Sequence, residues 1–160
     1  LCKSFSQGTM ESKMTPITDQ DRAERTAKEM WKLDLASQSI GMKIDRIEPG
    51  FCVASMTIAK HHLNGHGICH GGYIFMLADS AFAFACNSYN QMAVAQHNSI
   101  SFISPGRPNE VLQATAVETN RTGRSGIYDV KVTGEDGRIV AEFRGNSRTI
   151  KGQHFEEDKG

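Results

Sequence analysis

Two features of one segment have the chemistry of a reactive site: a pair of glycines in front of an apolar run, and a single carboxylate inside it. The segment is LNGHGICHGGYIFMLADSAFAFAC, residues 63–86, and the glycines are Gly71 and Gly72. Glycine lets a ligand approach the backbone closely. If the apolar run is a helix, its first amides are unpaired and lie at the positive end of the helix dipole. Such amides suit an oxyanion or a polarised carbonyl oxygen.

Asp79 is the only full charge in the apolar run. A buried, ionised carboxylate without partners is costly, so Asp79 is exposed, protonated, held by backbone donors or an arginine, or kept for a chemical purpose. It lies eight residues after Gly71, about two helical turns and about 12 Å along the axis. At that separation, one protomer's amide and carboxylate cannot readily touch the same small atom. The spacing favours a site in which one subunit supplies the helix start and another the helix middle.

The composition is that of an ordinary folded protein. The chain has 160 residues, 39% apolar and 22% charged, with 18 basic and 18 acidic side chains and zero net charge. This length favours one domain, and without a basic run no nucleic-acid partner is expected. The four cysteines lack metal-ligand spacing, which favours free thiols in the cytoplasm. The apolar stretch 73–86 is too short to span a membrane, so no membrane partner is expected either.

The pattern along the chain predicts a helix, two strands, one long apolar helix and four strands. Thr18 is expected to cap a first helix over residues 19–39, which ends before Gly41. A tight turn at Pro49-Gly50 joins the first two strands in a hairpin. The expected strands are residues 42–48, 51–58, 93–103, 110–119, 126–134 and 138–150.

This order lacks the strand–helix alternation of a parallel sheet and favours an α+β fold, with an antiparallel sheet packed on one helix. A helix that is apolar almost all round is buried on most sides. Either the sheet wraps around it, or a second subunit covers what the sheet leaves bare. We expect one domain over residues 18–151, between a disordered N-terminal tail (1–17) and a flexible C-terminal tail (152–160).

Several motifs, in their order and spacing, resemble the hotdog-fold acyl-CoA thioesterases, and most closely the phenylacetate-degradation thioesterase family. They are Asn64-Gly65, His70-Gly71-Gly72 and the helix LADSAFAFACNS, followed by FISPG, GIYDV and FRG. The resemblance covers roughly residues 40–150. It implies the hotdog fold: a curved antiparallel sheet of about six strands around one long central helix, here preceded by an N-terminal helix.

The resemblance also implies a reaction and its residues. An aryl-acyl (phenylacetyl-type) or short-to-medium acyl-CoA thioester is hydrolysed to free acid and CoA, without a metal or other cofactor. The enzymes are homodimers, usually paired into tetramers, with active sites at the subunit interface. Asp79 would act as a general base on water or as a nucleophile. The Gly71 N–H, next to Gly72 and helped by Asn64, would polarise the thioester carbonyl, and His70 would shape or assist the pocket.

Two further segments are compared with the family. Some members carry a water-positioning serine on the facing strand of the partner subunit, and Ala95 stands at the corresponding place here. The helper is therefore absent or replaced by Gln96, His97 or Asn98. Gly72, Gln96 and His97 are also expected to contact the substrate. The turn that follows the expected strand over residues 110–119 resembles the segment that meets the pantetheine and phosphate end of CoA. Its candidate residues are Arg121, Arg124, Ser125 and Gly126, because arginines and glycine amides suit a phosphate.

Other interpretations stay open at this point. Histidines at positions 61, 62, 66 and 70 invite a metal site, but the intervening glycines break the helix that would align them. Cys69-His70 suggests a thiolate–imidazole pair, although neighbours in an extended loop point apart. The alternative functions are a hotdog acyl-thioester hydratase or dehydratase, which needs a histidine base, and a non-catalytic acyl-CoA-binding module.

Overall fold

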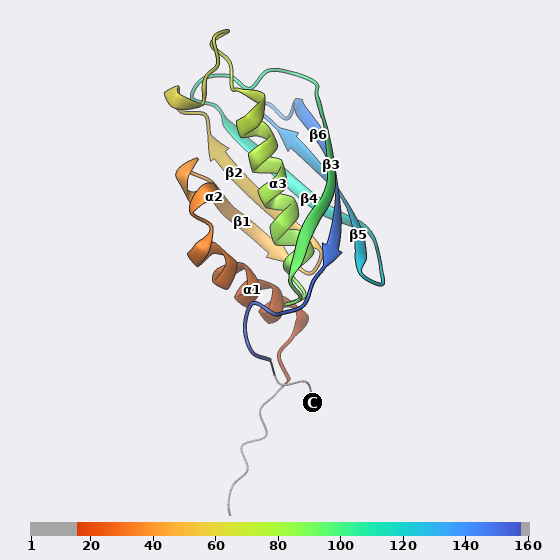
Figure 1. Cartoon of the computed structure of the whole chain (residues 1–160). Coiled ribbons are helices and arrows are strands. Elements are labelled where there is room, and N and C mark those ends of the chain that lie inside the picture. The colour runs from red at the N-terminus through yellow and green to blue at the C-terminus, as the bar shows by residue number, and fades with distance from the viewer. Residues whose placement is uncertain (1–15, 158–160) are drawn as a thin grey trace, which may run out of the picture.

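An antiparallel sheet of six strands packs against one long helix, α3 (Gly71–Asn87), in the computed structural model, which describes residues 16–157 (Figure 1). The strand order is β1-β2-β4-β5-β6-β3, so β1 and β3 form the two edges. The predicted order of elements is confirmed. The strand bounds are β1 Lys43–Glu48, β2 Phe51–Thr57, β3 Ala93–Phe102, β4 Val111–Thr122, β5 Ser125–Thr133 and β6 Ile139–Thr149, with a short 3-10 turn η1 at Lys60–His62.

The sheet encloses most of α3, as its apolar composition predicts. Strand β2 alternates buried and half-buried positions, with Cys52, Ala54 and Met56 turned inward. Gly145 on β6 lies under the ring of Phe82, and a Cβ there would come within 2.8 Å of that ring. Small residues in the sheet therefore let the helix approach closely. Within residues 16–157, no helix combines the length and apolarity that a bilayer crossing requires.

The first helix is interrupted, which corrects the prediction of one continuous helix over residues 19–39. The helix α1 (Asp19–Leu33) begins as predicted, with Thr18 Oγ1 accepting from the Asp21 N–H at 3.0 Å. Asp34 then leaves the helical conformation, and its carboxylate accepts from the Ser37 N–H to cap a second short helix, α2 (Leu35–Ser39). Aspartate competes for nearby backbone donors and so favours caps over helix interiors. Ser37 Oγ lies 2.8 Å from Ser80 Oγ, which ties α2 to α3.

The hairpin predicted at Pro49-Gly50 is confirmed. Glu48 pairs with Phe51 across the turn. Gly50 has a φ of 69°, a conformation that glycine adopts without strain. The turn is also crowded, because a Cβ on Gly50 would lie 2.7 Å from Tyr89 Oη.

The end of the described chain folds back onto α1 and the C-terminal end of α3. Asn90 Oδ1 accepts from the N–H groups of His154 and Phe155, and Glu157 pairs with Arg22 at 2.6 Å. The prediction of a flexible tail from residue 152 does not account for these contacts, because so short and polar a segment carries no periodic signal. Residues 1–15 of the predicted N-terminal tail, and residues 158–160, lie outside the described residues.

His154 makes stability depend on pH. Its Nε2 lies 2.7 Å from Asn87 Oδ1, and burial lowers its pKa below the ordinary value. Below about pH 6.5 the unfolded chain therefore binds more protons than the folded protein does. The contribution of neutral, buried His154 to stability is complete above that pH and is lost as the pH falls through it. We expect the melting temperature to fall on acidification through this range, and to fall less in His154→Gln. Thermal melts on either side of the transition measure the difference; identical slopes would assign the effect to other groups.

Candidate functional site

An imidazole caps the start of α3. His70 is the N-cap residue, and its Nδ1 accepts from the Gly72 N–H at 2.9 Å. An accepting Nδ1 places the ring proton on Nε2 of a neutral ring, so exposed His70 presents an N–H donor outward. A larger residue at Gly72 would crowd the imidazole, because a Cβ there would lie 3.1 Å from that Nδ1. The Gly72 amide is thereby occupied and is not a free donor for substrate.

The Gly71 amide stays free. Its N–H has no acceptor within residues 16–157. Phe102, at the end of β3, lies over it: a Cβ on Gly71 would come within 3.0 Å of the Phe102 ring, which belongs to a side chain 53% exposed. An unpaired helix-start amide beside an aromatic face suits a carbonyl oxygen attached to an apolar group.

Asn64 organises the loop that precedes α3. Its Oδ1 accepts from the N–H groups of His66 at 2.9 Å and Ile68 at 3.4 Å, and its own N–H donates to the Ile68 carbonyl at 2.8 Å. Asn64 thus turns the loop, as asparagine commonly does. Because Oδ1 is anchored in this way, the two Nδ2 hydrogens are left for another acceptor, such as a carbonyl oxygen.

Asp79 is half-buried in the middle of α3, beside the edge strand β3. Its Oδ1 accepts a hydrogen bond from Asn98 Nδ2 at 2.7 Å. Burial raises the pKa of Asp79, and the Asn98 hydrogen bond opposes that rise by favouring the ionised form. In the described part of the chain, no lysine or arginine pairs with Asp79. Asp79 is therefore not a structural carboxylate held by an arginine. Its raised pKa gives it the basicity of a proton acceptor.

A β-bulge decides which residue of β3 faces Asp79. Ala95 pairs with Ser147 and His97 pairs with Asn146, so Gln96 is an extra residue between two rungs of the ladder. Beyond the bulge the inward positions shift by one residue. Asn98 then sits opposite Gly145, a buried position on β6.

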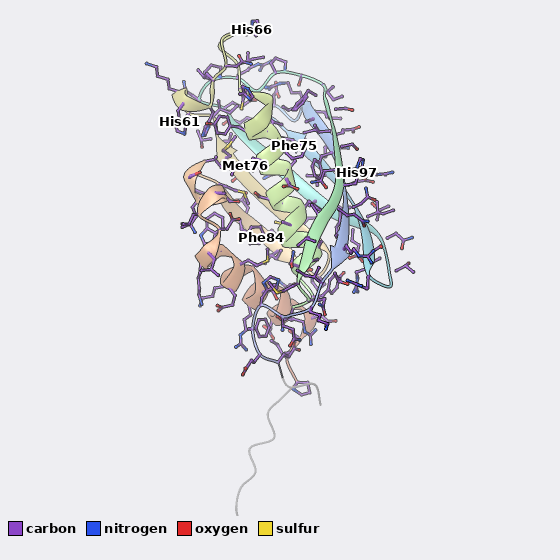
Figure 2. The ribbon with its side chains drawn as sticks, in the orientation of Figure 1. His61, His66, Phe75, Met76, Phe84 and His97 are labelled. Carbon is purple, nitrogen blue, oxygen red and sulfur yellow. The ribbon has the colours of Figure 1, made fainter. Side chains whose placement is uncertain are left out.

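Of the three candidates for the missing helper, Asn98 is the one whose side chain contacts Asp79. Gln96 and His97, predicted as substrate-binding, are exposed and form no hydrogen bond with Asp79 in this protomer. Figure 2 shows His97 on the side of β3 away from α3. A signal was present in the sequence: Ala93 and Ile100, which both pack against the core, are an odd number of residues apart, as a bulge between them requires.

The β4–β5 hairpin lies at the opposite end of the sheet from the start of α3 (Figure 1). The Arg121 guanidinium stacks on Tyr89, with its central carbon 3.7 Å from the ring centroid. Arg124 donates to the Thr149 carbonyl at 2.9 Å. Both arginines remain substantially exposed, so their charge is accessible from solvent.

Ser125 and Gly126, the two other predicted residues of this hairpin, differ in exposure. Ser125 opens β5 and is exposed. Gly126 is buried in the sheet, where a Cβ would lie 2.7 Å from Ser147 Oγ, so close packing already requires a small residue there. One protomer does not bring this hairpin to Asp79 or to Gly71.

The thiols are not nucleophiles in this site. Cys52, Cys69 and Cys86 are free and buried. Burial raises the pKa of Cys69 to about 11 and that of Cys52 and Cys86 to about 12, so all three stay protonated at neutral pH. Cys69 Sγ contacts the His70 carbonyl at 3.7 Å and His70 Nδ1 accepts from the Gly72 N–H, so the structure does not join thiol and imidazole as a catalytic pair. Within the described residues, no three histidine, cysteine, aspartate or glutamate side chains gather as metal ligands would.

Comparison with known proteins shows the family of the chain. The profile of the Thioesterase superfamily matches residues 66–141. Acyl-coenzyme A thioesterase PaaI of Escherichia coli is 40% identical over 131 residues, which are 82% of this chain and 94% of that protein. A putative esterase of Archaeoglobus fulgidus is 34% identical over 122 residues, 76% of this chain and 79% of its own. The solved structure of E. coli PaaI, from the phenylacetic acid degradation operon, matches with a TM-score of 0.84 and 38% identity, covering 85% of this chain and 99% of that one.

The sheet wrapped on one long helix, with its capped helix start and half-buried carboxylate, defines a hotdog-fold protein of the thioesterase superfamily. More narrowly, the chain belongs to the family of the PaaI acyl-CoA thioesterases. The fold class and family predicted from the sequence motifs are both confirmed.

Proposed function

We propose that this protein is a thioester hydrolase that converts aryl-acyl (phenylacetyl-type) or short-to-medium acyl-CoA thioesters to free acid and CoA. One observation carries the proposal: an unpaired Gly71 amide and a half-buried Asp79 lie two turns apart on one helix and border the same edge strand. The activity named for E. coli PaaI, at 40% identity, supports the same reaction class.

In the proposed reaction, the thioester carbonyl oxygen accepts from the Gly71 N–H and from Asn64 Nδ2. Asp79 takes a proton from water as the water oxygen bonds to the carbonyl carbon; the C–S bond then breaks, and the departing sulfur takes up a proton. In the second route, an Asp79 oxygen bonds to the carbonyl carbon, the C–S bond breaks and the sulfur takes up a proton, and water then attacks the Asp79 carboxyl carbon of the resulting anhydride. The Nε2–H of His70 lines the entrance. A single turnover in oxygen-18 water distinguishes the routes, because only the second leaves label in Asp79.

Each proposed active site combines two protomers, because Gly71 and Asp79 are about 12 Å apart along their own helix. The ten-residue edge strand β3 offers unpaired backbone groups along its open side. Asp79 borders β3 at Asn98, and Gly71 borders it at Phe102. An antiparallel pair of β3 strands centred near Ile100 places Asn98 opposite the partner's Phe102. That pairing brings one Asp79 to the partner's Gly71.

The same twofold pairing reverses the partner, so the partner's β4–β5 hairpin moves toward the end of the molecule where α3 begins. We propose that Arg121, Arg124 and Ser125 of that hairpin meet the phosphates of CoA there. Two such dimers are proposed to associate as a tetramer. A cytoplasmic location agrees with the free, buried thiols.

Release of free thiol from phenylacetyl-, benzoyl- and aliphatic CoA thioesters tests the function. We expect at least one of these three kinds of CoA thioester to be hydrolysed. Binding of acyl-CoA without thiol release would instead support the non-catalytic module. Turnover of an enoyl thioester without thiol release would support the hydratase.

Mixing two inactive variants tests the shared site. When Asp79→Asn protomers exchange with Gly71→Pro protomers, about half of the dimers are mixed, and each mixed dimer contains one intact site and one doubly impaired site. We expect about a quarter of wild-type activity to return. If each site lay within one protomer, both variants would stay inactive after mixing.

A further inference from the structure

A β-bulge places Arg121 on the same face of the sheet as Glu118. Residues three apart on a regular strand point to opposite faces. Here Glu118 pairs with Tyr128 and Arg121 pairs with Gly126, so Thr119 is an extra residue between these rungs. Tyr128 packs against Phe82 of α3, and Gly126 shares its face because it lies two residues away. Both charged side chains therefore lie on the side of the sheet that carries the helix.

Two tyrosine hydroxyls fix the Glu118 carboxylate. Tyr128 Oη donates to Glu118 Oε2 at 2.6 Å, and Tyr89 Oη donates to the same oxygen at 2.9 Å. Burial and the nearby carboxylate raise the pKa of Tyr89 to about 12, so its hydroxyl stays protonated and remains a donor. The turn at Gly50 closes over both groups, because a Cβ there would lie 2.7 Å from Tyr89 Oη and 3.0 Å from Glu118 Cβ. The ring of Tyr89 is therefore held in one position.

Arg121 is held against this ring with donors to spare. The central carbon of its guanidinium lies 3.7 Å from the Tyr89 ring centroid, and its Nε lies 3.5 Å from Glu118 Oε2. A contact of 3.5 Å is too long for a strong hydrogen bond, and a guanidinium carries five N–H donors. The side chain of Arg121 is 46% exposed and that of Glu118 24%, so the positive charge lies nearer to solvent.

A phosphate group suits a guanidinium held in this way. The planar fork of arginine binds two phosphate oxygens at once. A freely rotating arginine would lose rotamer freedom when it binds, whereas a side chain already held on an aromatic ring loses less, so the stack favours binding by preorganisation. Arg124, by comparison, lies in the turn of the hairpin and donates to the Thr149 carbonyl.

We propose that Tyr89 is a positioning residue for the substrate: its ring, fixed by Glu118, holds the Arg121 guanidinium in the orientation in which it binds a phosphate group of CoA. This inference rests on the proposed thioesterase function, in which the β4–β5 hairpin meets the phosphates. It assigns a task to a residue beyond the end of α3, outside that hairpin. It also predicts that this cluster favours thioesters of CoA over thioesters of thiols that carry no phosphate.

Kinetics on substrates with and without phosphates test the assignment in the full chain. An acyl-CoA is compared with the acyl-pantetheine, which keeps the acyl group and the thioester but has no phosphate. In Tyr89→Leu, which removes the ring, we expect KM for acyl-CoA to rise about 3- to 10-fold at unchanged kcat. The KM for acyl-pantetheine should stay within about twofold of wild type. An acyl-dephospho-CoA assigns the contact: the rise disappears if Arg121 binds the 3′-phosphate and persists if it binds the diphosphate.

Further variants separate positioning from a structural role. Tyr89→Phe keeps the stacked ring, so its KM for acyl-CoA should lie within about twofold of wild type. Arg121→Gln should raise that KM at least as much as Tyr89→Leu, and combining the two should add nothing, because Tyr89 acts through Arg121. Phe155→Leu is the matched control. It removes a ring that lies 4.1 Å from the central carbon of the Arg25 guanidinium, on α1, and should leave both KM values unchanged.

Any of four results in Tyr89→Leu would overturn the inference: an unchanged KM for acyl-CoA, an equal rise in KM for acyl-pantetheine, a fall in kcat on both substrates, or an effect that adds to that of Arg121→Gln. An equal loss in Tyr89→Phe would also overturn it, because the ring would not be what holds Arg121. The dissociation constant of free CoA, measured by calorimetry, separates this inference from the proposed function. If wild type releases thiol and Tyr89→Leu binds CoA as tightly, only the inference fails. If wild type binds CoA but releases no thiol, the proposed function fails, and weaker CoA binding in Tyr89→Leu still supports the positioning role.

Discussion

Replacing Gly71 with proline is expected to lower kcat for thioester hydrolysis by about 10²- to 10³-fold, the effect of removing one oxyanion donor. Proline is the one substitution that deletes a backbone N–H. The fold tolerates it at this position because Gly71 is the first residue of α3, where proline is favoured and its fixed φ suits the helix. The preceding residue, His70, already has φ −63° and ψ 134°, the extended conformation that a following proline requires.

Gly71→Ala is the matched control for that experiment. Both substitutions place a Cβ 3.0 Å from the Phe102 ring, so both require this half-exposed ring to shift slightly. Only proline removes the amide hydrogen. Steady-state kinetics and thermal melts of the two variants separate the effects, and we expect alanine to retain most of the activity. Equal losses in kcat would mean that crowding by Phe102, rather than the missing donor, limits the reaction.

Asp79→Asn is expected to lower kcat by about 10²- to 10⁴-fold, the usual contribution of a general base. The variant keeps the shape of the side chain, and its amide oxygen can still accept from Asn98 Nδ2. Thiol release from phenylacetyl-CoA and an aliphatic CoA measures the loss. Hydrolysis at the wild-type rate by this variant would contradict the proposed role of Asp79 under either route.

The pH dependence of Asp79 can be stated with its sign. Burial raises the pKa of the carboxyl in the folded protein, so the ionised form is disfavoured there relative to the unfolded chain. At a pH above this raised pKa, ionised Asp79 lowers the stability of the fold while it supports catalysis. We therefore expect Asp79→Asn to melt at the same temperature as wild type or higher at neutral pH. Wild-type kcat/KM should fall on acidification with an apparent pKa above the ordinary aspartate range.

Most of the architecture follows from local patterns. Apolar alternation, turn residues such as Pro49-Gly50 and the Thr18 cap predict the order of the helices and strands, and the structure confirms that order. The exception, the break at Asp34, depends on a local competition: its carboxylate binds the Ser37 N–H instead of continuing the helix. The contacts of residues 153–157 could not be predicted, because they depend on partners such as Arg22 and Asn90 far away in sequence.

The features of the site likewise divide into those that the sequence predicts and those that it does not. The Gly71 amide and the Asp79 carboxylate are recognisable from residue type and from a spacing that a helix makes rigid. The cap that His70 forms on the Gly72 amide is local as well, whereas the choice of Asn98 over Gln96 and His97 cannot be made from the sequence.

The physical reason is the range over which each feature is determined. Helical spacing, capping and turn chemistry act within a few residues, so the chain alone specifies where the amide donor and the carboxylate stand on α3. Strand register acts across the sheet: one extra residue at Gln96, forced by the pairing of β3 with β6, changes which side chains point inward. Asn98 becomes the neighbour of Asp79 only through that pairing, and the β4–β5 hairpin is placed far from the helix start by the same sheet order.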